Sequence, residues 1–339
     1  MTFPTSRCER SLLFLSPYKY TMKLHHILAF LLLVVLACAS LLVGVANVSL
    51  SQILAGDSHS LNILLVSRLP RLLAIVLAGA GLSIAGLIMQ QIVQNRFAAP
   101  STTGTVDWAM FGYIVALILF ADMSSWVHLI TIFAFSVIGT VIFVRFLQRL
   151  KFKNTVLVPL IGIMYGNVVS SMTTFIAYKY DLVQTLGSWT VANFASVLRG
   201  NYEFLYLALP VSVLAYAYAN RFSAASVGES FAKNIGLNYQ RIVLVGVILV
   251  AVLSSSVVMI VGMIPFLGLI VPNLVSLFIG DNMRRNLPWT AYAGVILVLT
   301  CDILGRLIIF PYEIPISMII SILGGSIFIY LVLRDKSNA

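Results

Sequence analysis

A few charged side chains lie inside long apolar stretches of this chain, where their types and spacing could do chemistry. Asp302 and Arg306 are four residues apart, so a helix would place them on one face, where they can form an ion pair. Asp107 lies near the start of another apolar stretch, where Arg96 or a neighbouring helix could supply a partner. Ionisable side chains are costly inside a membrane and usually mark a functional site. The spacing predicts an intramembrane ion pair between Asp302 and Arg306, and the role of Asp107 stays open.

The sequence has no other cluster that is typical of catalysis or metal binding. It contains no Gly-x-x-x-x-Gly-Lys-Ser/Thr segment that could cradle nucleotide phosphates, and no His-Glu-x-x-His segment. Four scattered histidines lack the spacing of metal ligands: His25, His26, His59 and His128. We therefore expect no enzymatic activity, no metal site and no cofactor.

The composition excludes a soluble protein. Sixty per cent of the 339 residues are apolar and nine per cent are charged, whereas about a quarter of the residues in a typical soluble domain are charged. The net charge of +10 could indicate a nucleic-acid partner. However, the lysines and arginines lie in the connectors between apolar stretches, where membrane proteins carry their topology signals. We therefore expect a membrane protein that binds no nucleic acid.

The apolar stretches predict an all-α membrane protein with about ten transmembrane helices, because a helix needs about twenty apolar residues to cross the bilayer. The stretches are 27–48, 72–92, 103–121, 126–147, 155–178, 203–219, 242–262, 268–280, 289–308 and 315–333. Residues 182–198 are less apolar and predict a short re-entrant or interfacial helix. The domains that follow are a cytoplasmic tail over residues 1–26, with Met22 as an alternative start, a membrane domain over 27–334 and a tail over 335–339.

The positive charges predict how these helices are oriented. An even number of spans places both ends of the chain on one side of the membrane. If that side is the cytoplasm, sixteen lysines and arginines fall in the inner connectors and five fall outside, as the positive-inside rule requires. We expect a multi-pass protein of the cytoplasmic (inner) membrane with both termini in the cytoplasm.

The largest inner connector, residues 220–241, predicts a short helix on the cytoplasmic face. Ser226 is followed three residues later by Glu229, the pattern of a capping box at a helix start. Gly236 can end such a helix. A short amphipathic helix on this face is suited to the groove of a soluble partner. The alternative interpretation is a plain surface connector.

The same connector resembles a known family. The sequence Gly-Glu-x-x-Ala-x-x-Ile-Gly-Leu at residues 228–237 is similar to the coupling segment of FecCD-type permeases. These are the membrane subunits of ABC importers for ferric siderophores, haem and vitamin B12. Further segments resemble the family's motifs in the family's order: 67–71, 94–100, 266–273, 302–306, 313–315 and 324–325. The chain departs from the family pattern at Arg96, where a proline is usual, and at Asn273, where a histidine is usual.

The resemblance implies a mechanism and a set of partners. It implies a transport subunit without its own nucleotide-binding site, driven by two copies of a separate ABC ATPase. It also implies a second permease subunit, either a copy of this chain or a paralogue, and a periplasmic or lipoprotein substrate-binding protein. The chain looks most like the branch that imports catecholate-type ferric siderophores. The expected cargo is therefore a ferric siderophore.

The resemblance also implies three sets of site residues. The arginines expected to dock acidic side chains of the binding protein are Arg68, Arg71 and Arg306. For Arg68 and Arg71, the alternative is to anchor a helix end at the lipid head groups. The residues expected to contact the ATPase are Gly228, Glu229, Ser230, Ala232, Lys233 and Gly236. The residues expected to line the translocation pathway are Met164, Asn167, Ser171, Thr174, Ser188 and Trp189.

Other functions remain open at this level. A permease for another large chelate, such as haem or vitamin B12, would share the same motifs. An ion-coupled secondary transporter would need ionisable residues near the membrane midplane, and only Asp107 and Asp302 qualify. A polytopic membrane enzyme would need a catalytic cluster at the end of a span, which the sequence lacks.

Overall fold

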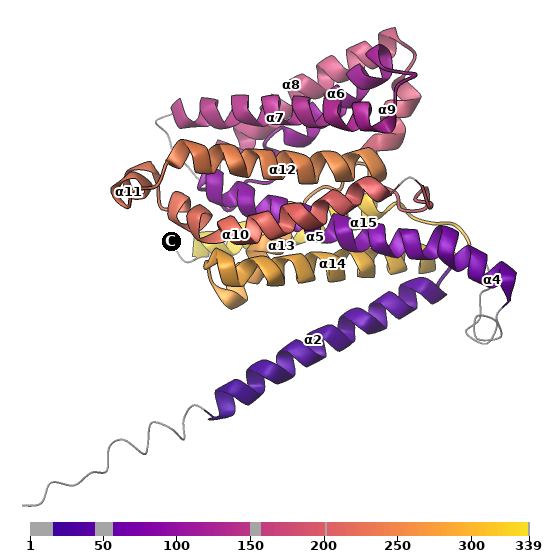
Figure 1. Cartoon of the computed structure of the whole chain (residues 1–339), viewed down its shortest axis with the longest axis horizontal. Coiled ribbons are helices and arrows are strands. Elements are labelled where there is room, and N and C mark those ends of the chain that lie inside the picture. Colours follow the sequence, from indigo (N-terminus) through magenta and orange to yellow (C-terminus); the bar gives the residue numbers. More distant parts are fainter. Residues whose placement is uncertain (1–15, 45–56, 150–156, 201, 338–339) are drawn as a thin grey trace, which may run out of the picture.

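The computed structural model describes residues 16–44, 57–149, 157–200 and 202–337. Over these ranges the chain is a bundle of helices without strands (Figure 1), which confirms the predicted all-α class. Its main helices, in chain order, are α2 (Ser16–Leu42), α4 (Ser58–Ile63), α5 (Leu69–Val93), α6 (Thr105–Leu119), α7 (Ser125–Arg149), α8 (Leu157–Lys179), α9 (Val183–Thr190), α10 (Ala208–Ser226), α11 (Glu229–Asn234), α12 (Tyr239–Val261), α13 (Leu267–Ile279), α14 (Met283–Leu307) and α15 (Ile316–Ser337). Three short turns complete them: η1 (Leu64–Arg68), η2 (Pro100–Thr102) and η3 (Glu203–Leu207).

Many of these helices suit a membrane. Among the described residues, five helices are long and apolar enough to cross one: Ser58–Val93, Ser125–Arg149, Leu157–Lys179, Tyr239–Val261 and Met283–Leu307. Four shorter apolar helices accompany them: Ile27–Leu42, Thr105–Leu119, Leu267–Ile279 and Ile316–Ile329. Each of the ten predicted stretches overlaps a helix of the structure. The chain is therefore a multi-pass membrane protein, and the count of ten crossings stays a prediction.

Two helix starts differ from the sequence-based boundaries. Helix α2 begins at Ser16, so residues 16–26 are helical rather than a separate tail. The second predicted stretch begins at residue 72, whereas the helix that leads into α5 starts at Ser58. In both cases polar residues at the start of the helix interrupt the apolar pattern on which the prediction depended.

The helix that leads into α5 passes through a proline without a break. Pro70 has no N–H, so it cannot donate to the carbonyl of Val66, its i−4 partner. That carbonyl instead accepts a hydrogen bond of 3.0 Å from the backbone N–H of Arg199. The preceding turn, Leu64–Arg68, is π-helical, a form in which one extra residue is taken into a helix. A distant segment thus satisfies the group that the proline leaves free.

Helix α5 lies at the centre of the bundle, and most of its side chains are buried (Figure 1). Its glycines allow close backbone contacts with two neighbours. A Cβ atom at Gly79 would lie 3.0 Å from the carbonyl oxygen of Gly294 in α14, and one at Gly86 would collide with the carbonyl of Gly268 in α13. Small residues are typical of such interfaces, because lipid provides no hydrophobic force between helices. Helices α5, α13 and α14 therefore form one closely packed unit.

The two ends of the bundle differ, and both are visible in Figure 1. Helix α11 and the described end of the chain lie at one end, which we call the α11 end. Helices α4 and α9 lie at the opposite end, which we call the α4 end. Helix α12 separates α6, α7 and α8 on one side from α5, α13 and α14 on the other (Figure 1). The candidate site residues fall at both ends and on the surface of α8.

Candidate functional site

At the α4 end, Arg71 of α5 joins two acids that are distant in the sequence. Its Nη2 donates to Asp302 Oδ1 of α14 at 2.7 Å, and its Nε donates to the same oxygen at 3.2 Å. Its Nη1 and Nη2 also donate to the two carboxylate oxygens of Glu313, each at 3.0 Å. Such paired, charge-assisted bonds are the strongest that arginine makes. The Asp302 side chain is 3% exposed, Arg71 13% and Glu313 26%.

Arg306 completes this cluster, which we call the Arg71 network (Arg71, Asp302, Arg306 and Glu313). Its Nη2 pairs with Asp302 Oδ2 one helical turn away. The same guanidinium reaches the end of α2, where it donates to the carbonyls of Ser40 at 2.9 Å and Val43 at 2.7 Å. Asp302 therefore forms ion pairs with both Arg71 and Arg306 inside the membrane domain.

Arg68 meets the same helix end. Its Nη1 donates to the carbonyls of Leu41 at 2.5 Å and Leu42 at 3.0 Å. The last carbonyls of a helix have no partner within it, and positive charge is favourable there. Arg68 and Arg306 together satisfy carbonyls at the end of α2 and fasten it to the bundle.

The resemblance implied that Arg68, Arg71 and Arg306 dock the binding protein. The structure brings the three together but turns them inward: Arg68 is 7% exposed and Arg306 5%. In this conformation each guanidinium donates to acceptors of its own chain. Sequence reasoning left the role of Glu313 open, although its position before Pro315 in a family motif was a signal. Docking by these arginines stays a prediction, and Arg71 is the most exposed residue of the three.

Helix α11 is the short helix that the sequence predicts at the α11 end, and Figure 1 shows it projecting from the bundle. Its C-terminus follows the Schellman pattern, in which Gly236 N–H bonds to Lys233 O at 3.0 Å and Leu237 N–H to Ala232 O at 2.9 Å. Gly236 has the positive φ of 77° that this pattern favours. The predicted role of Gly236 in ending the helix matches this geometry.

The predicted capping box is wrong. Ser226 is the last residue of α10, and its hydroxyl donates to Ser223 O at 2.8 Å. The N-cap of α11 is Gly228, with φ of 128° and no side-chain cap. A sharp turn between two helices requires this backbone conformation, which glycine adopts without strain. Glu229 instead forms an exposed ion pair of 2.8 Å with Lys233.

Three exposed apolar side chains at α11 were missed by sequence reasoning. Val227 precedes the N-cap Gly228, Phe231 lies within the helix and Ile235 is its C-cap, and they are 65%, 44% and 51% exposed. Of the predicted contact residues, Glu229, Ser230, Lys233 and Gly236 are exposed, while Gly228 and Ala232 are buried against the bundle.

The predicted pathway residues lie on α8 and α9. Four of them are exposed on α8: Met164, Asn167, Ser171 and Thr174. Only 28% of the most apolar stretch of this helix is buried. The two hydroxyl groups are satisfied within the helix, since Ser171 donates to Asn167 O at 2.8 Å and Thr174 donates to Ser170 O at 2.9 Å. A surface of this kind offers mixed polar and apolar character without strong binding groups.

The α9 residues divide into two environments. Ser188 is exposed and donates to Thr185 O at 2.7 Å. Trp189 is half-buried and packs on Tyr113 of α6, with 4.2 Å between ring centroids. Sequence reasoning also missed two aromatic side chains of α8, Phe175 and Tyr178, which are 72% and 77% exposed. Large apolar side chains on a face without a partner were not distinguishable from buried ones by sequence pattern.

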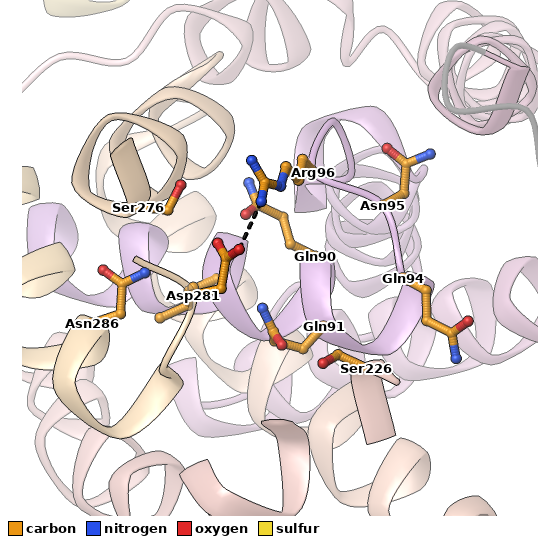
Figure 2. A pocket seen from close by; sticks show the side chains of 10 residues that line it. Gln90, Gln91, Gln94, Asn95, Arg96, Ser226, Ser276, Asp281 and Asn286 are labelled. Carbon is orange, nitrogen blue, oxygen red and sulfur yellow. Dashed lines mark hydrogen bonds and ion pairs between the residues drawn. The ribbon is translucent and has the colours of Figure 1, made fainter. Parts of the chain in front are cut away.

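A polar cavity of about 210 Å³ opens at the α11 end (Figure 2). It is lined by Leu87, Gln90, Gln91, Gln94, Asn95, Arg96, Ser226, Ser276, Asp281 and Asn286. Arg96 pairs there with Asp281 at 2.7 Å, and not with Asp107, for which Arg96 was one of two possible partners. The side-chain amide of Asn273 donates to the Arg96 carbonyl at 2.7 Å. Two of the positions that depart from the family pattern are thus in direct contact.

Transport proteins are similar to this chain over nearly its whole length. The sequence model of the FecCD transport family matches residues 32–334. The petrobactin import system permease protein YclN of Bacillus subtilis is 47% identical, covering 94% of this chain and 100% of that protein. The petrobactin import system permease protein FatD of Bacillus anthracis is 40% identical, covering 91% of each.

A solved structure shares the fold. It is described as an inward-facing conformation of a metal-chelate type ABC transporter, and it has a TM-score of 0.74 and 26% sequence identity. The similarity covers 90% of this chain and 97% of that one. The arrangement of helices in Figure 1 is therefore that of an ABC transporter permease.

Proposed function

As a member of the FecCD transport family, this chain is a permease subunit of an ABC importer, and we propose that it moves a ferric siderophore of the catecholate type across the cytoplasmic membrane. The observation that carries the cargo proposal is the 47% identity with a petrobactin permease over that protein's whole length. Petrobactin is a siderophore of the catecholate type. Haem and vitamin B12 remain the alternative cargoes within the family.

The direct test is uptake in a strain that lacks this gene. Radioactive iron bound to petrobactin should enter the parent strain and a complemented strain, but not the deletion strain. Haem and vitamin B12 uptake should be the same in all three strains. Loss of haem or vitamin B12 uptake together with normal uptake of ferric petrobactin would overturn the proposed cargo.

We propose that α11 receives the motion of a separate ATPase, present in two copies. The exposed apolar side chains of Val227, Phe231 and Ile235 support this role, because apolar groups at a short projecting helix are stabilised when a partner buries them. The flanking Glu229 and Lys233 provide charges at the rim of such a contact. The permease would then convert movement of the ATPase into alternating access.

We propose that the α8 face adjoins a second permease subunit, with the translocation pathway between the two. The mixed surface of Met164, Asn167, Ser171 and Thr174 suits a large cargo that must slide past without being trapped. Helix α15 offers a further exposed apolar face at Met318, Ile322 and Ile329. Whether the second subunit is a copy of this chain or a paralogue is a question for co-purification from the native cell.

Orientation follows from the distribution of charge. We propose that the α11 end faces the cytoplasm, with both termini on that side. The basic side chains at this end are Arg96, Arg145, Arg149, Arg221, Lys233, Arg241, Arg284 and Arg285. The positive-inside rule supports this placement. The α4 end would then face the binding protein, with an acid of that protein beside or in place of Glu313 at Arg71.

The ion-coupled alternative has less support. A coupling ion needs an acid that is free to bind it, and Asp302 is engaged by both Arg71 and Arg306. Asp107 makes no ion pair within the part of the chain that the structure describes, and its carboxylate packs against Gly166 of α8. One acid without a relay of partners gives a proton or sodium ion no route across the bundle.

A further inference from the structure

A groove between α7 and α12 has features that the transport function does not use. Its volume is about 370 Å³, and it lies at the α11 end. Arg145 and Gln148 from α7 meet Gln240 and Arg241 from the start of α12 at its polar part. Helices α7 and α12 run in opposite directions. The end of α7 and the start of α12 therefore bring Arg145 and Arg241 to the same opening.

The rest of the groove is aliphatic. Val141 and Val144 on α7 face Val243, Leu244 and Val247 on α12. These residues lie further from the helix ends than the arginines do, and therefore deeper in the membrane domain. The groove thus changes from cationic at its mouth to apolar along its length.

The apolar part continues onto the outer surface of both helices. Ile138 and Ile142 of α7 are 49% and 46% exposed, and Leu244 and Ile248 of α12 are 49% and 37% exposed. A groove with a cationic mouth and an aliphatic length complements a phospholipid, which has an anionic phosphate next to its apolar acyl chains.

The two arginines have no anion of their own in the described chain. Several other basic side chains at the α11 end have partners: Arg96 pairs with Asp281, Lys233 pairs with Glu229, and Arg221 lies over the Tyr218 ring. Neither Arg145 nor Arg241 has an ion pair within the ranges that the structure describes. Two guanidinium groups at one opening favour an anion between them, and their planar forks match the geometry of a phosphate.

We infer that this groove binds an anionic phospholipid of the cytoplasmic leaflet, with its phosphate between Arg145 and Arg241 and an acyl chain along the valine-lined track. Basic pockets between transmembrane helices on the cytoplasmic side are suited to such head groups. The inference rests on the proposed orientation of the α11 end. An acidic loop of the ATPase is the rival occupant, but a soluble protein has no use for an aliphatic track that runs into the bilayer.

The test measures lipid binding by the purified full-length chain in a neutral detergent. Native mass spectrometry would count bound phosphatidylglycerol and phosphatidylcholine across a titration of each lipid. We expect phosphatidylglycerol to bind more tightly, and Arg145→Gln/Arg241→Gln to weaken its binding by about thirtyfold, since each of the two basic residues near the membrane surface contributes about 1 kcal/mol. Phosphatidylcholine binding should change little.

A matched control removes the same charge elsewhere at this end. Arg221→Gln/Arg285→Gln should retain the preference for phosphatidylglycerol. Arg145→Lys/Arg241→Lys keeps both charges and should retain most of it, which separates the loss of charge from a failure to fold. Equal binding of the two lipids, or equal loss in the control, would overturn the inference.

Two further outcomes would also count against it. Inorganic phosphate that competes as well as the lipid would show that the acyl track contributes nothing. Loss of ATPase co-purification in Arg145→Gln/Arg241→Gln, with phosphatidylglycerol binding unchanged, would assign the groove to the ATPase. None of these measurements uses the cargo, so they stand apart from the siderophore proposal.

The proposed cytoplasmic orientation of the α11 end can be tested separately by thiol labelling. Arg241→Cys should be labelled by a membrane-impermeant thiol reagent only after cells are opened, above the background of the parent chain. Labelling in intact cells would place the groove at the outer leaflet and overturn the stated leaflet, whatever the lipid affinity.

Discussion

Arg71 and Glu313 meet through two parallel hydrogen bonds of 3.0 Å at the α4 end of the bundle. The same guanidinium binds Asp302 of α14, so one side chain of α5 ties together two later segments of the chain. The network contains two arginines and two acids, and its charges balance. A balanced cluster of this kind can be kept in a membrane domain, where a single charge is costly.

The first prediction concerns the acid at the centre of this network. Asp302→Asn should lower the free energy of unfolding by about 3 kcal/mol or more, because two buried arginines lose their shared carboxylate. Thermal unfolding of the purified permease in detergent would measure the change. Asp107→Asn is the matched control, since Asp107 has no ion pair in the described chain, and it should cost much less. Equal losses for the two variants would contradict the central position of Asp302.

The second prediction concerns the end of α2. Arg68→Gln should loosen its last turn, because the carbonyls of Leu41 and Leu42 lose their donor. Hydrogen exchange of peptides that cover residues 36–44 should become faster. Arg199→Gln, an exposed arginine at the same end, should leave these peptides unchanged. Unaltered exchange in Arg68→Gln would show that Arg306 alone holds the helix end.

The third prediction concerns Phe231, an exposed aromatic residue of α11. Phe231→Ala should weaken association with the ATPase by about tenfold or more, as expected for an aromatic anchor at an interface. The variant should fold normally, because Phe231 is 44% exposed. Co-purification with the ATPase gives the measurement. Tyr312→Ala removes an aromatic ring that is 76% exposed at the opposite end, and it should have no effect.

The fourth prediction concerns backbone contact inside the bundle. Gly86→Ala should prevent normal folding or cost about 2 kcal/mol or more, since the added methyl group collides with the carbonyl of Gly268. Gly325 is the control, because a Cβ atom there has no neighbour within 4 Å. Gly325→Ala should be neutral or slightly stabilising, given the higher helix propensity of alanine. Similar yields of folded protein from both variants would contradict the close approach.

The fifth prediction concerns pH at the α4 end. The Tyr202 and Tyr206 hydroxyls lie 3.0 Å apart, and this hydrogen bond, aided by burial, raises the pKa of Tyr202 from 10.0 to about 12. The folded state thus favours the neutral phenol, and the stabilisation is complete below a pH of 10.0 and is lost as pH rises through about 12. Tyr206→Phe should move tyrosinate absorbance to lower pH. Tyr312→Phe should not, and coincident shifts would refute the pairing.

Much of the architecture could be predicted because membrane helices leave a strong local pattern. A run of apolar residues is enough to locate a helix such as α7 or α12. The spacing of Asp302 and Arg306 was likewise a local signal, since a helix brings residues four apart together. The predicted helix at α11 depended on glycines and charges within one short connector.

Other features depend on partners that no local pattern reveals. Arg71 lies 231 residues from Asp302 and 242 from Glu313, so only the fold brings them together. The carbonyl freed by Pro70 accepts a hydrogen bond from the backbone N–H of Arg199, which belongs to another segment. The error at Ser226 has a simpler cause: a serine can cap the start of one helix or end the helix before it.

The glycine contacts of α5 limit how the protein can move. A helix whose backbone touches those of two neighbours cannot rotate about its own axis or slide along them without a steric clash. Helices α5, α13 and α14 must therefore travel as a rigid block. This block has the Arg71 network at one end and the polar cavity at the other. A tilt of the block at one surface of the membrane would therefore also displace its other end.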